Sequence, residues 1–171
     1  LLLIGTYGGG LNVFNERTGG FTHYQWDADD SSSISSNNVV AIVEDRDRNI
    51  WIGTENGINF FDRESGRFQR FTSDTANPES LSSNLAWALH EDGEGDLWIG
   101  TQSGGLNKWS GSDKRNKTNR FSQYLENIGL PSADIYAITS DKNSDIWISH
   151  NRGLTRISSD DTSSEHFDLT D

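Results

Sequence analysis

The sequence predicts an all-β chain: a β-propeller fragment of about 3.75 four-stranded antiparallel blades. The segment IWIGT at residues 50–54 recurs as LWIGT at 97–101, and in altered form as LLIGT at 2–6 and IWISH at 146–150. A spacing in the high forties is typical of an array of one repeated unit. No stretch shows sustained helical periodicity, and short apolar runs alternate with turn residues throughout. The spacings are 48, 47 and 49 residues, counted through Leu3, Trp51, Trp98 and Trp147.

The second repeat shows the unit most clearly. Apolar, β-branched runs are separated by the turn segments DRDRN, ENG and RESG. Runs of this length with such short turns predict an antiparallel meander. The four expected strands are residues 38–44, 49–54, 58–62 and 67–72.

The other repeats follow the same order, except that the first lacks its leading strand. Strands are expected at 2–6, 11–14 and 21–24, at 85–91, 97–101, 106–109 and 120–124, and at 135–140, 146–150, 154–157 and 165–168. The whole chain, 1–171, is then one partial propeller. Its expected blades are residues 1–26 (partial), 37–73, 84–125 and 134–169.

Composition excludes several classes of protein. The 171 residues contain no Cys, so disulfides, thiolate metal sites and a cysteine nucleophile are excluded. The net charge of −12 argues against nucleic acid and against anionic membrane surfaces as partners. No run has the length of a membrane helix and no signal peptide is present, so membrane contact is expected only through segments outside this sequence.

The recurring tryptophans and alanines have structural interpretations. Trp51, Trp98 and Trp147 are expected to anchor adjacent blades, because a blade cannot bury both faces alone. Small residues at matching positions of the leading strands fit a close approach near the axis: Ala41, Ala88 and Ala137. An arc of this size cannot close a ring, so we expect flanking blades or self-association of the fragment, such as a two-chain ring.

The combined motif is more specific than a generic blade. It joins Ser-Leu/Ile-Ser-Ser-Asn, an apolar strand ending in Glu-Asp, a turn, and Ile/Leu-Trp-Ile-Gly-Thr, as in residues 33–62 and 80–109. This pattern closely resembles the two-component regulator propeller repeat. The fourth copy departs from it at Ser149-His150 and at Ser140-Asp141, and the first has Leu3 in place of Trp.

The resemblance implies an extracytoplasmic, periplasmic sensor or ligand-binding module of a bacterial signal-transduction protein. In such proteins a histidine kinase or a diguanylate cyclase is often the output, and this sequence contains neither. No catalytic activity and no cofactor are therefore assigned to it. The alternatives are a propeller scaffold for protein–protein interaction and, less favoured, a propeller lyase or glycosidase.

Three charged clusters could carry other chemistry. The D-x-D-x-N pattern at Asp45, Asp47 and Asn49 is similar to the start of a calcium loop, but it lacks the later Gly and Glu, so a self-capped turn is favoured. The acidic cluster of Asp27, Asp29 and Asp30 is expected to be a solvated loop, and so is the basic run of Lys114, Arg115 and Lys117. The histidines show no metal spacing, and no metal site is expected.

Meander geometry locates a candidate ligand face. The linkers into each leading strand and the turns after the Trp strands should share one face of the ring, and the Asp-rich turns the other. Amides, hydroxyls and a few charges there suit a small polar ligand, such as an oligosaccharide. The candidates from the linkers are Asn37, Asn38, Ser83, Asn84, Ser132 and Asp134, and those from the turns are Tyr7, Glu55, Asn56, Gln102, Ser103, Asn151 and Arg152.

Overall fold

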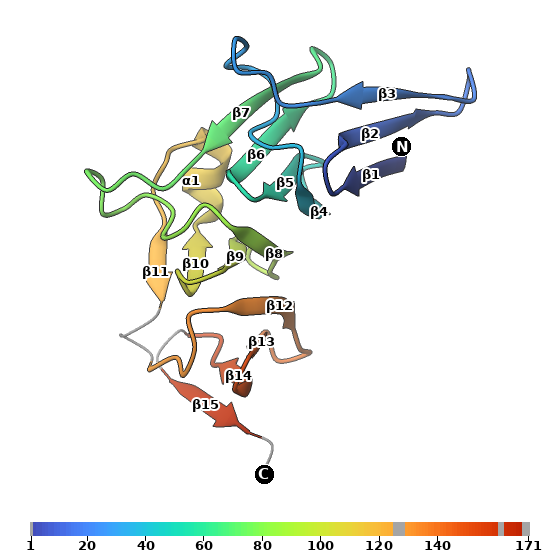
Figure 1. Ribbon diagram of the computed structural model, residues 1–171. Coiled ribbons are helices and arrows are strands. Elements are labelled where there is room, and N and C mark those ends of the chain that lie inside the picture. Colours follow the sequence, from blue (N-terminus) through green and yellow to red (C-terminus); the bar gives the residue numbers. More distant parts are fainter. Residues whose placement is uncertain (1, 125–128, 161–162, 169–171) are drawn as a thin grey trace.

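Four antiparallel sheets follow one another along the chain and form an open arc (Figure 1). The computed structural model describes residues 2–124, 129–160 and 163–168. Each sheet is a meander in which consecutive strands pair, so each is a blade. The predicted fold class is confirmed, including three strands in the first sheet and four in each of the others.

The strands are numbered along the chain. Blade 1 contains β1 (Leu2–Thr6), β2 (Gly10–Asn15) and β3 (Gly20–Tyr24). Blade 2 contains β4 (Val39–Glu44), β5 (Ile50–Thr54), β6 (Gly57–Asp62) and β7 (Arg67–Phe71). Blade 3 contains β8 (Ala86–Glu91), β9 (Leu97–Thr101), β10 (Leu106–Trp109) and β11 (Ser122–Tyr124). Blade 4 contains β12 (Ile135–Ser140), β13 (Ile146–His150), β14 (Gly153–Ile157) and β15 (Ser164–Phe167). The expected blade limits at residues 125 and 169 lie outside the described residues.

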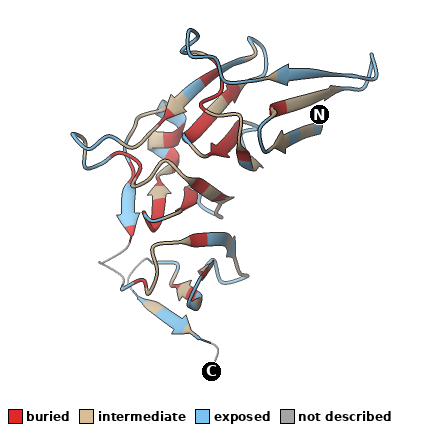
Figure 2. Cartoon of the chain, viewed as in Figure 1, coloured by how far each residue is buried: buried red, intermediate tan, exposed pale blue. Residues whose placement is uncertain are grey.

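Three apolar cores lie between adjacent blades. The middle one joins Trp51, Ile58 and Phe71 of blade 2 to Leu97 and Trp109 of blade 3, among others. The alternation of side chains along each Trp strand explains this, since Ile50 and Ile52 face blade 1 while Trp51 faces blade 3. Figure 2 shows burial concentrated in blades 2 and 3, with the outer strands β3 and β15 exposed.

The Trp side chains take the role that the sequence predicts in the two central blades. Trp51 is 1% exposed and meets the Trp109 ring edge-on, with centroids 4.9 Å apart. Trp98 is equally buried and contacts Tyr124, with Ile146 and Ile148 of blade 4 in the same core. Trp147 stacks on Phe167 within its own blade, on the face that no further blade covers in the described structure.

The glycine of the Trp strand allows the next blade to approach closely. A Cβ on Gly53 would lie 2.4 Å from the backbone oxygen of Ala86, the first residue of the next inner strand. A Cβ on Gly100 would lie 2.6 Å from the Ile135 side chain. In β4 and β8, Ala41 and Ala88 pair directly with these glycines, so two small residues form the contact zone. Blade 4 has Ser149 at the glycine position.

A buried polar cluster holds the linker onto blade 2. Asn59 Nδ2 donates to Ser35 Oγ over 2.8 Å, and the Ser35 amide donates back to Asn59 Oδ1 over 2.9 Å. Thr54 Oγ1 lies 2.8 Å from Ser35 Oγ and also donates to the Gly57 carbonyl. All the side chains are buried, so the hydrogen bonds replace those lost to water.

The same cluster recurs in blade 3. Asn107 Nδ2 donates to Ser82 Oγ over 2.7 Å, and the Ser82 amide donates to Asn107 Oδ1 over 3.0 Å. The residue before each of these linker serines enters the interblade core, as Ile34 and Leu81. The Ser-Leu/Ile-Ser motif is thus explained by one apolar anchor and one hydrogen-bonded serine.

The Asp-rich turns cap both their own backbone and the tryptophan. Asp45 Oδ1 accepts from the amides of Asp47 and Asn49, at 3.0 and 2.8 Å. Its Oδ2 accepts from Trp51 Nε1 at 2.8 Å. Asp92 and Asp141 repeat the arrangement with the tryptophans six residues later. The predicted turn is present, and the hydrogen bond to the indole is an addition that the sequence did not indicate.

The expectation for the basic run 114–117 was wrong. Residues 111–116 form the short helix α1 (Gly111–Asn116) between β10 and β11, although the sequence predicts no helix. Lys114 is 1% exposed, and its Nζ contacts Glu91 of β8 and lies 3.2 Å from Asp45 Oδ2. Lys117 Nζ lies 3.5 Å from the centroid of the Phe60 ring. The excursion folds back toward blade 2 because the buried carboxylate of Asp45 in blade 2 and the largely buried one of Glu91 in blade 3 need a cation.

Among the described residues, no helix is long and apolar enough to cross a membrane.

Candidate functional site

The linkers and the turns that follow the Trp strands lie on one face, which we call the linker face. The amide of Gly57 donates to the carbonyl of Asn84 over 2.6 Å, and that of Gly105 to Ala133 over 2.9 Å. Each such bond joins the turn of one blade to the linker of the next. Antiparallel pairing places the Asp-rich turns at the opposite ends of the strands, on the Asp-turn face.

The structure brings Tyr7, Asn38 and Glu55 together on this face. Tyr7 Oη donates to Glu55 Oε1 over 2.8 Å, and Asn38 Nδ2 donates to Glu55 Oε2 over 2.5 Å. The hydrogen bonds from Asn38 and then Tyr7 hold the pKa of Glu55 below its usual value. The hydrogen bond to Glu55, with the carboxylate charge, raises the pKa of Tyr7. Tyr7 is 77% exposed, so this carboxylate and phenol are open to a ligand.

A second polar pair joins blades 3 and 4. The Ser103 amide donates to Asp134 Oδ1 over 2.9 Å, and Ser103 Oγ lies 3.5 Å from the same oxygen. Ser103 has a positive φ of 62°, which turns its amide toward the linker. At the boundary of blades 1 and 2, the linker residue Asn38 contacts Glu55 in the turn of its own blade, and Glu55 contacts Tyr7 of the preceding blade. At the boundary of blades 3 and 4, the linker residue Asp134 contacts Ser103 in the turn of the preceding blade.

The remaining candidate residues differ in whether their polar groups already form hydrogen bonds within the protein. Asn37 Oδ1 accepts from the Trp26 amide, and Asn84 Oδ1 accepts from the Ser73 amide, both over 2.7 Å. These two asparagines fix the linkers. Asn56 Nδ2 donates to the Ser35 carbonyl over 3.2 Å. Ser83 and Ser132 accept from backbone amides two residues later, Gln102 is half-buried, and Asn151 is exposed.

An aromatic pair on the inner strands is not among the residues that the sequence predicts for this face. Trp87 and Tyr136 stack across blades 3 and 4, with ring centroids 5.6 Å apart and an interplanar angle of 22°. Each is the residue at the irregularity near the start of its inner strand, and Val40 holds the same position in blade 2. Tyr136 is 48% exposed. The sequence does contain a signal for this pair, because both aromatic residues directly precede the alanine that recurs in the inner strands.

A cavity of about 250 Å³ opens beside the linker of blade 4. Arg152, one of the predicted residues, lines it. The others that line it are Pro131, His150, His166, Phe167 and Asp168. The cavity combines a cation, an anion and two imidazoles, which no corresponding position of blades 2 and 3 offers.

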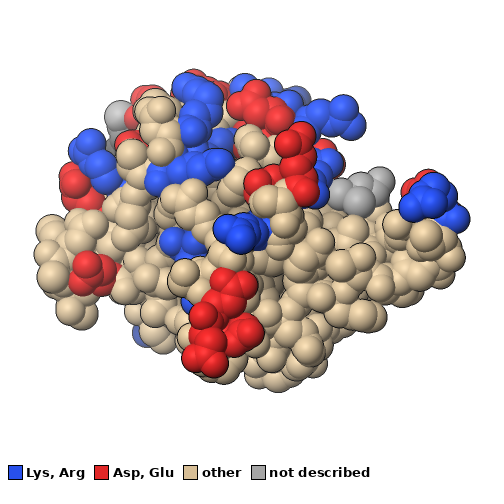
Figure 3. All heavy atoms as spheres, turned by 90° about the horizontal axis from the view of Figure 1, so that it is seen from above, with Lys and Arg blue, Asp and Glu red and all other residues tan. Residues whose placement is uncertain are grey.

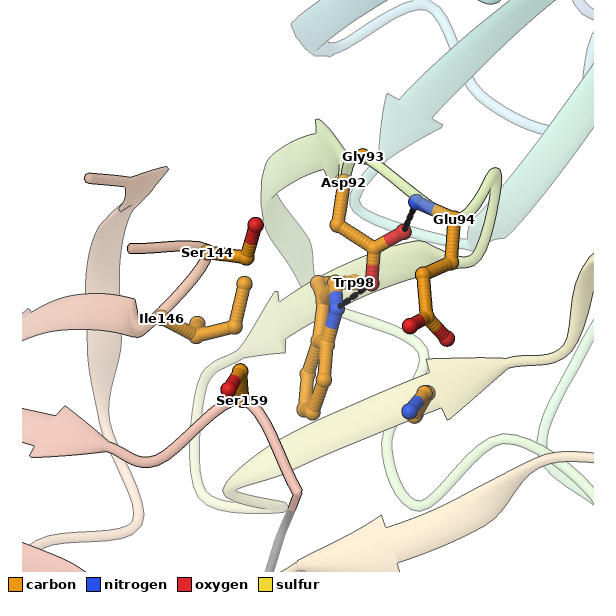
Figure 4. A pocket seen from close by; sticks show the side chains of 8 residues that line it. Asp92, Gly93, Glu94, Trp98, Ser144, Ile146 and Ser159 are labelled. Atoms are coloured by element: carbon orange, nitrogen blue, oxygen red, sulfur yellow. Dashed lines mark hydrogen bonds between the residues drawn. The ribbon is translucent and has the colours of Figure 1, made fainter. Parts of the chain in front are cut away.

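The Asp-turn face has a much smaller cavity. Figure 4 shows Asp92, Glu94 and Trp98 of blade 3 opposite Ser144, Ile146 and Ser159 of blade 4. The volume of about 20 Å³ is of the order needed for one water molecule, not for a sugar ring. No group of three or more His, Cys, Asp or Glu side chains that could hold a metal ion occurs among the described residues.

Basic and acidic side chains lie next to one another on the surface seen in Figure 3, and much of that surface is uncharged.

The polar linkers, the Trp strands and the Asp turns form one repeating unit, and comparison with known families identifies it. The sequence model of the family described as two component regulator propeller matches residues 33–56, 80–103 and 129–152. The chain contains three two component regulator propeller repeats. The matches cover the linker, inner strand, Asp turn and Trp strand of blades 2, 3 and 4.

Solved structures similar to this chain include extracellular domains of regulatory systems. The extracellular domain assigned to a hybrid two component system of B. thetaiotaomicron is 28% identical, with a TM-score of 0.78, over 95% of this chain and 21% of that one. That assigned to a one component system of the same organism is 23% identical, with a TM-score of 0.78, over 95% of this chain and 23% of that one. The repeat chain thus spans about a fifth of these domains.

Propeller enzymes are more distant. Virginiamycin B lyase from Staphylococcus aureus is 18% identical, with a TM-score of 0.63, over 94% of this chain and 49% of that one, and shows the fold alone. A comparison with curated protein sequences found no match.

Proposed function

We propose that these repeats are part of the periplasmic sensor of a bacterial signal-transduction protein and bind a small polar ligand on the linker face. The similarity to extracellular domains of two component systems supports the setting. The observation that supports binding is the cluster of Tyr7, Asn38 and Glu55, where a carboxylate and an exposed phenol meet at a blade boundary. A histidine kinase or a diguanylate cyclase is the proposed output of the longer protein.

The chemistry of the face favours a hydroxyl-rich ligand such as an oligosaccharide. Glu55, Asp134 and the Tyr7 oxygen, whose hydrogen is donated to Glu55, can accept hydrogen bonds, while the Asn151 amide can donate them. The Trp87–Tyr136 pair adds a flat apolar surface at the inner strands, against which the carbon face of a sugar ring can pack. A ligand that bridges blade boundaries would favour one arrangement of the blades, and so could shift a conformational equilibrium in the output.

A thermal-shift screen of oligosaccharides tests this function. We expect at least one compound to raise the melting temperature of the chain, and Glu55→Gln and Trp87→Ala each to abolish that rise. Asp47→Asn is the matched control, since it removes one exposed carboxylate from the Asp-turn face.

Two outcomes separate the alternatives. A shift that persists in Glu55→Gln and Trp87→Ala would place the ligand elsewhere. If no oligosaccharide raised the melting temperature of the unaltered chain, the result would contradict a sugar ligand and favour a scaffold that binds only proteins.

A further inference from the structure

Blade 4 replaces the linker cluster of blades 2 and 3 with titratable groups. By strand register, His150 of blade 4 corresponds to Thr54 of blade 2, and Thr155 corresponds to Asn59. The linker serine of that cluster becomes Pro131, which has neither a hydroxyl nor an amide hydrogen to offer. The outer-strand position of Arg70 in blade 2 is held by His166.

These residues form a continuous hydrogen-bond chain through one hydroxyl. His150 Nε2 lies 2.9 Å from Thr155 Oγ1, and the same oxygen lies 2.8 Å from His166 Nδ1. Thr155 is fully buried and His150 is 6% exposed, so water does not substitute for a broken bond at Thr155. The chain links β13 to β14 and β14 to the edge strand β15.

The direction of donation follows from the backbone. The Arg152 amide donates to His150 Nδ1 over 3.2 Å, so this nitrogen carries no hydrogen in the bonded state. The neutral ring then carries its hydrogen on Nε2 and donates to Thr155. The Thr155 hydroxyl has one hydrogen, which it donates to His166 Nδ1.

Both imidazole nitrogens that accept hydrogen bonds in this chain lose that role on protonation. A proton on His150 Nδ1 displaces the Arg152 amide. A proton on His166 Nδ1 turns this nitrogen from an acceptor into a donor, so that the Thr155 hydroxyl can no longer donate to it. Burial, followed by the charges of His166 and Arg152, holds the pKa of His150 below its ordinary value.

Few other charged groups lie near the two imidazoles in the described structure. Asp168 is the one acidic residue among the described residues that line the cavity. Asp134 of the linker is engaged by Ser103, and Glu165 of β15 pairs with Arg156 at 2.8 Å. The chain is therefore complete only when both imidazoles are neutral.

We propose that His150, Thr155 and His166 form a proton-sensitive hydrogen-bond chain that holds β15 on blade 4 at neutral pH and loosens it on acidification. In the described structure β15 is an edge strand that pairs with β14, whereas the other edge strand, β12, also packs against β8 and β9 of blade 3, so β15 has the least support in this blade. The proposal goes beyond ligand sensing and stands whether or not the linker face binds a sugar.

Hydrogen exchange on the full chain tests the proposal. Protection factors, which correct for the pH dependence of intrinsic exchange, are compared at about pH 7.5 and about pH 5.5, on either side of the ordinary histidine pKa. We expect protection of β15 to fall on the order of tenfold more than that of β7, the matching strand of blade 2.

Two variants isolate the chain. His166→Gln places there the residue that blade 3 has at this position, Gln123, and should remove the acid response of β15. His90→Gln removes the other histidine of lowered pKa, which is half-buried in blade 3, and should leave the response intact. An equal response in the unaltered chain and in His166→Gln would overturn the proposal, as would a loss confined to His90→Gln.

A measurement on the unaltered chain decides the matter if His166→Gln does not fold. In an NMR titration, the Arg152 amide signal should move together with the His150 ring signals as the pH falls. Titration of His150 without any change at Arg152 would overturn the proposal.

Discussion

The carboxylate of Asp45 accepts the indole hydrogen of Trp51 over 2.8 Å, and the same oxygen lies 3.2 Å from Lys114 Nζ of the next blade. One oxygen thus fixes the tryptophan rotamer in blade 2 and binds the cation that α1 supplies from blade 3. Asp92 and Asp141 bond their tryptophans without such a lysine within the described contacts.

Asp45→Asn is expected to lower the free energy of unfolding by about 3 kcal/mol, because it leaves Lys114 without one of its two buried partners. Asp141→Asn removes the matching carboxylate from blade 4, where no buried lysine depends on it, and its loss should be smaller. Urea unfolding of both variants measures the difference. Equal losses would show that the lysine contact adds nothing.

The stability of the chain should also fall in acid through Asp45. Burial opposes ionisation of this carboxyl, but hydrogen bonds from Trp51 and Asn49, with the Lys114 charge, outweigh it and hold the pKa of Asp45 below 3.8. The unfolded state therefore binds the proton first, so the contribution is complete above about pH 5 and is lost as the pH falls through the folded pKa. Asp45→Asn should flatten this part of the stability–pH curve. An unchanged slope in the variant would contradict the assignment.

Lys114→Met should destabilise the chain by about 3 kcal/mol, since it strands the carboxylates of Asp45 and Glu91 in a buried setting. Arg115→Met is the control, because it removes the adjacent and exposed charge of the same basic run. Differential scanning calorimetry of both variants gives the comparison. Similar melting temperatures would contradict the interblade role of Lys114.

Gly53→Ala should cost about 1–3 kcal/mol, because the added Cβ would lie 2.4 Å from a backbone oxygen of blade 3 that has little freedom to move. Gly20→Ala adds the same methyl group where the nearest atom is a threonine hydroxyl at 3.7 Å, and should be close to neutral. Thermal unfolding of the pair tests the packing argument. A neutral Gly53→Ala would show that blade 3 shifts freely.

Self-association through the uncovered face of blade 4 is a further expectation. Trp147, Leu154 and Phe167 occupy the positions that Trp51, Ile58 and Phe71 bury against blade 3, and Leu154 is 45% exposed. At the opposite end of the arc, Leu2 and Ile4 of blade 1 are exposed. They correspond to Leu97 and Ile99 of blade 3, which lie in one core with Trp51. Head-to-tail contact between copies follows from these two complementary faces.

Light scattering with size-exclusion chromatography tests this association. Leu154→Lys should shift the chain toward the monomer, whereas Trp26→Lys, which replaces another exposed apolar residue, should not. A monodisperse monomer of the unaltered chain would contradict the expectation.

The blades could be predicted because every strand repeats a pattern that blade packing requires. Trp51 and Trp98 recur at one spacing, and the turns between strands have clear residue signals. The helix α1 could not be predicted, since its six residues lack an apolar stripe and depend on Lys114 finding two carboxylates distant in sequence.

The candidate face was predicted from topology, but its individual contacts were not. Meander geometry placed Tyr7 and Glu55 on the linker face, and their hydrogen bond depends on the spacing of two blades, which no local pattern encodes. Trp87 and Tyr136 were missed because single aromatics in apolar strands look like core residues. The His150 chain was missed because its members belong to three different strands.

Ser149 makes the outer face of blade 4 different from the matching faces of blades 1 to 3. Blades 1 to 3 each present a glycine to the strand that follows, and that strand lies where a side chain would otherwise be. Blade 4 presents a hydroxymethyl group there, so a neighbour on that side must lie farther out or begin with a different residue. The blades are therefore not interchangeable: shuffling or duplicating them by their sequence similarity alone would join surfaces that do not match.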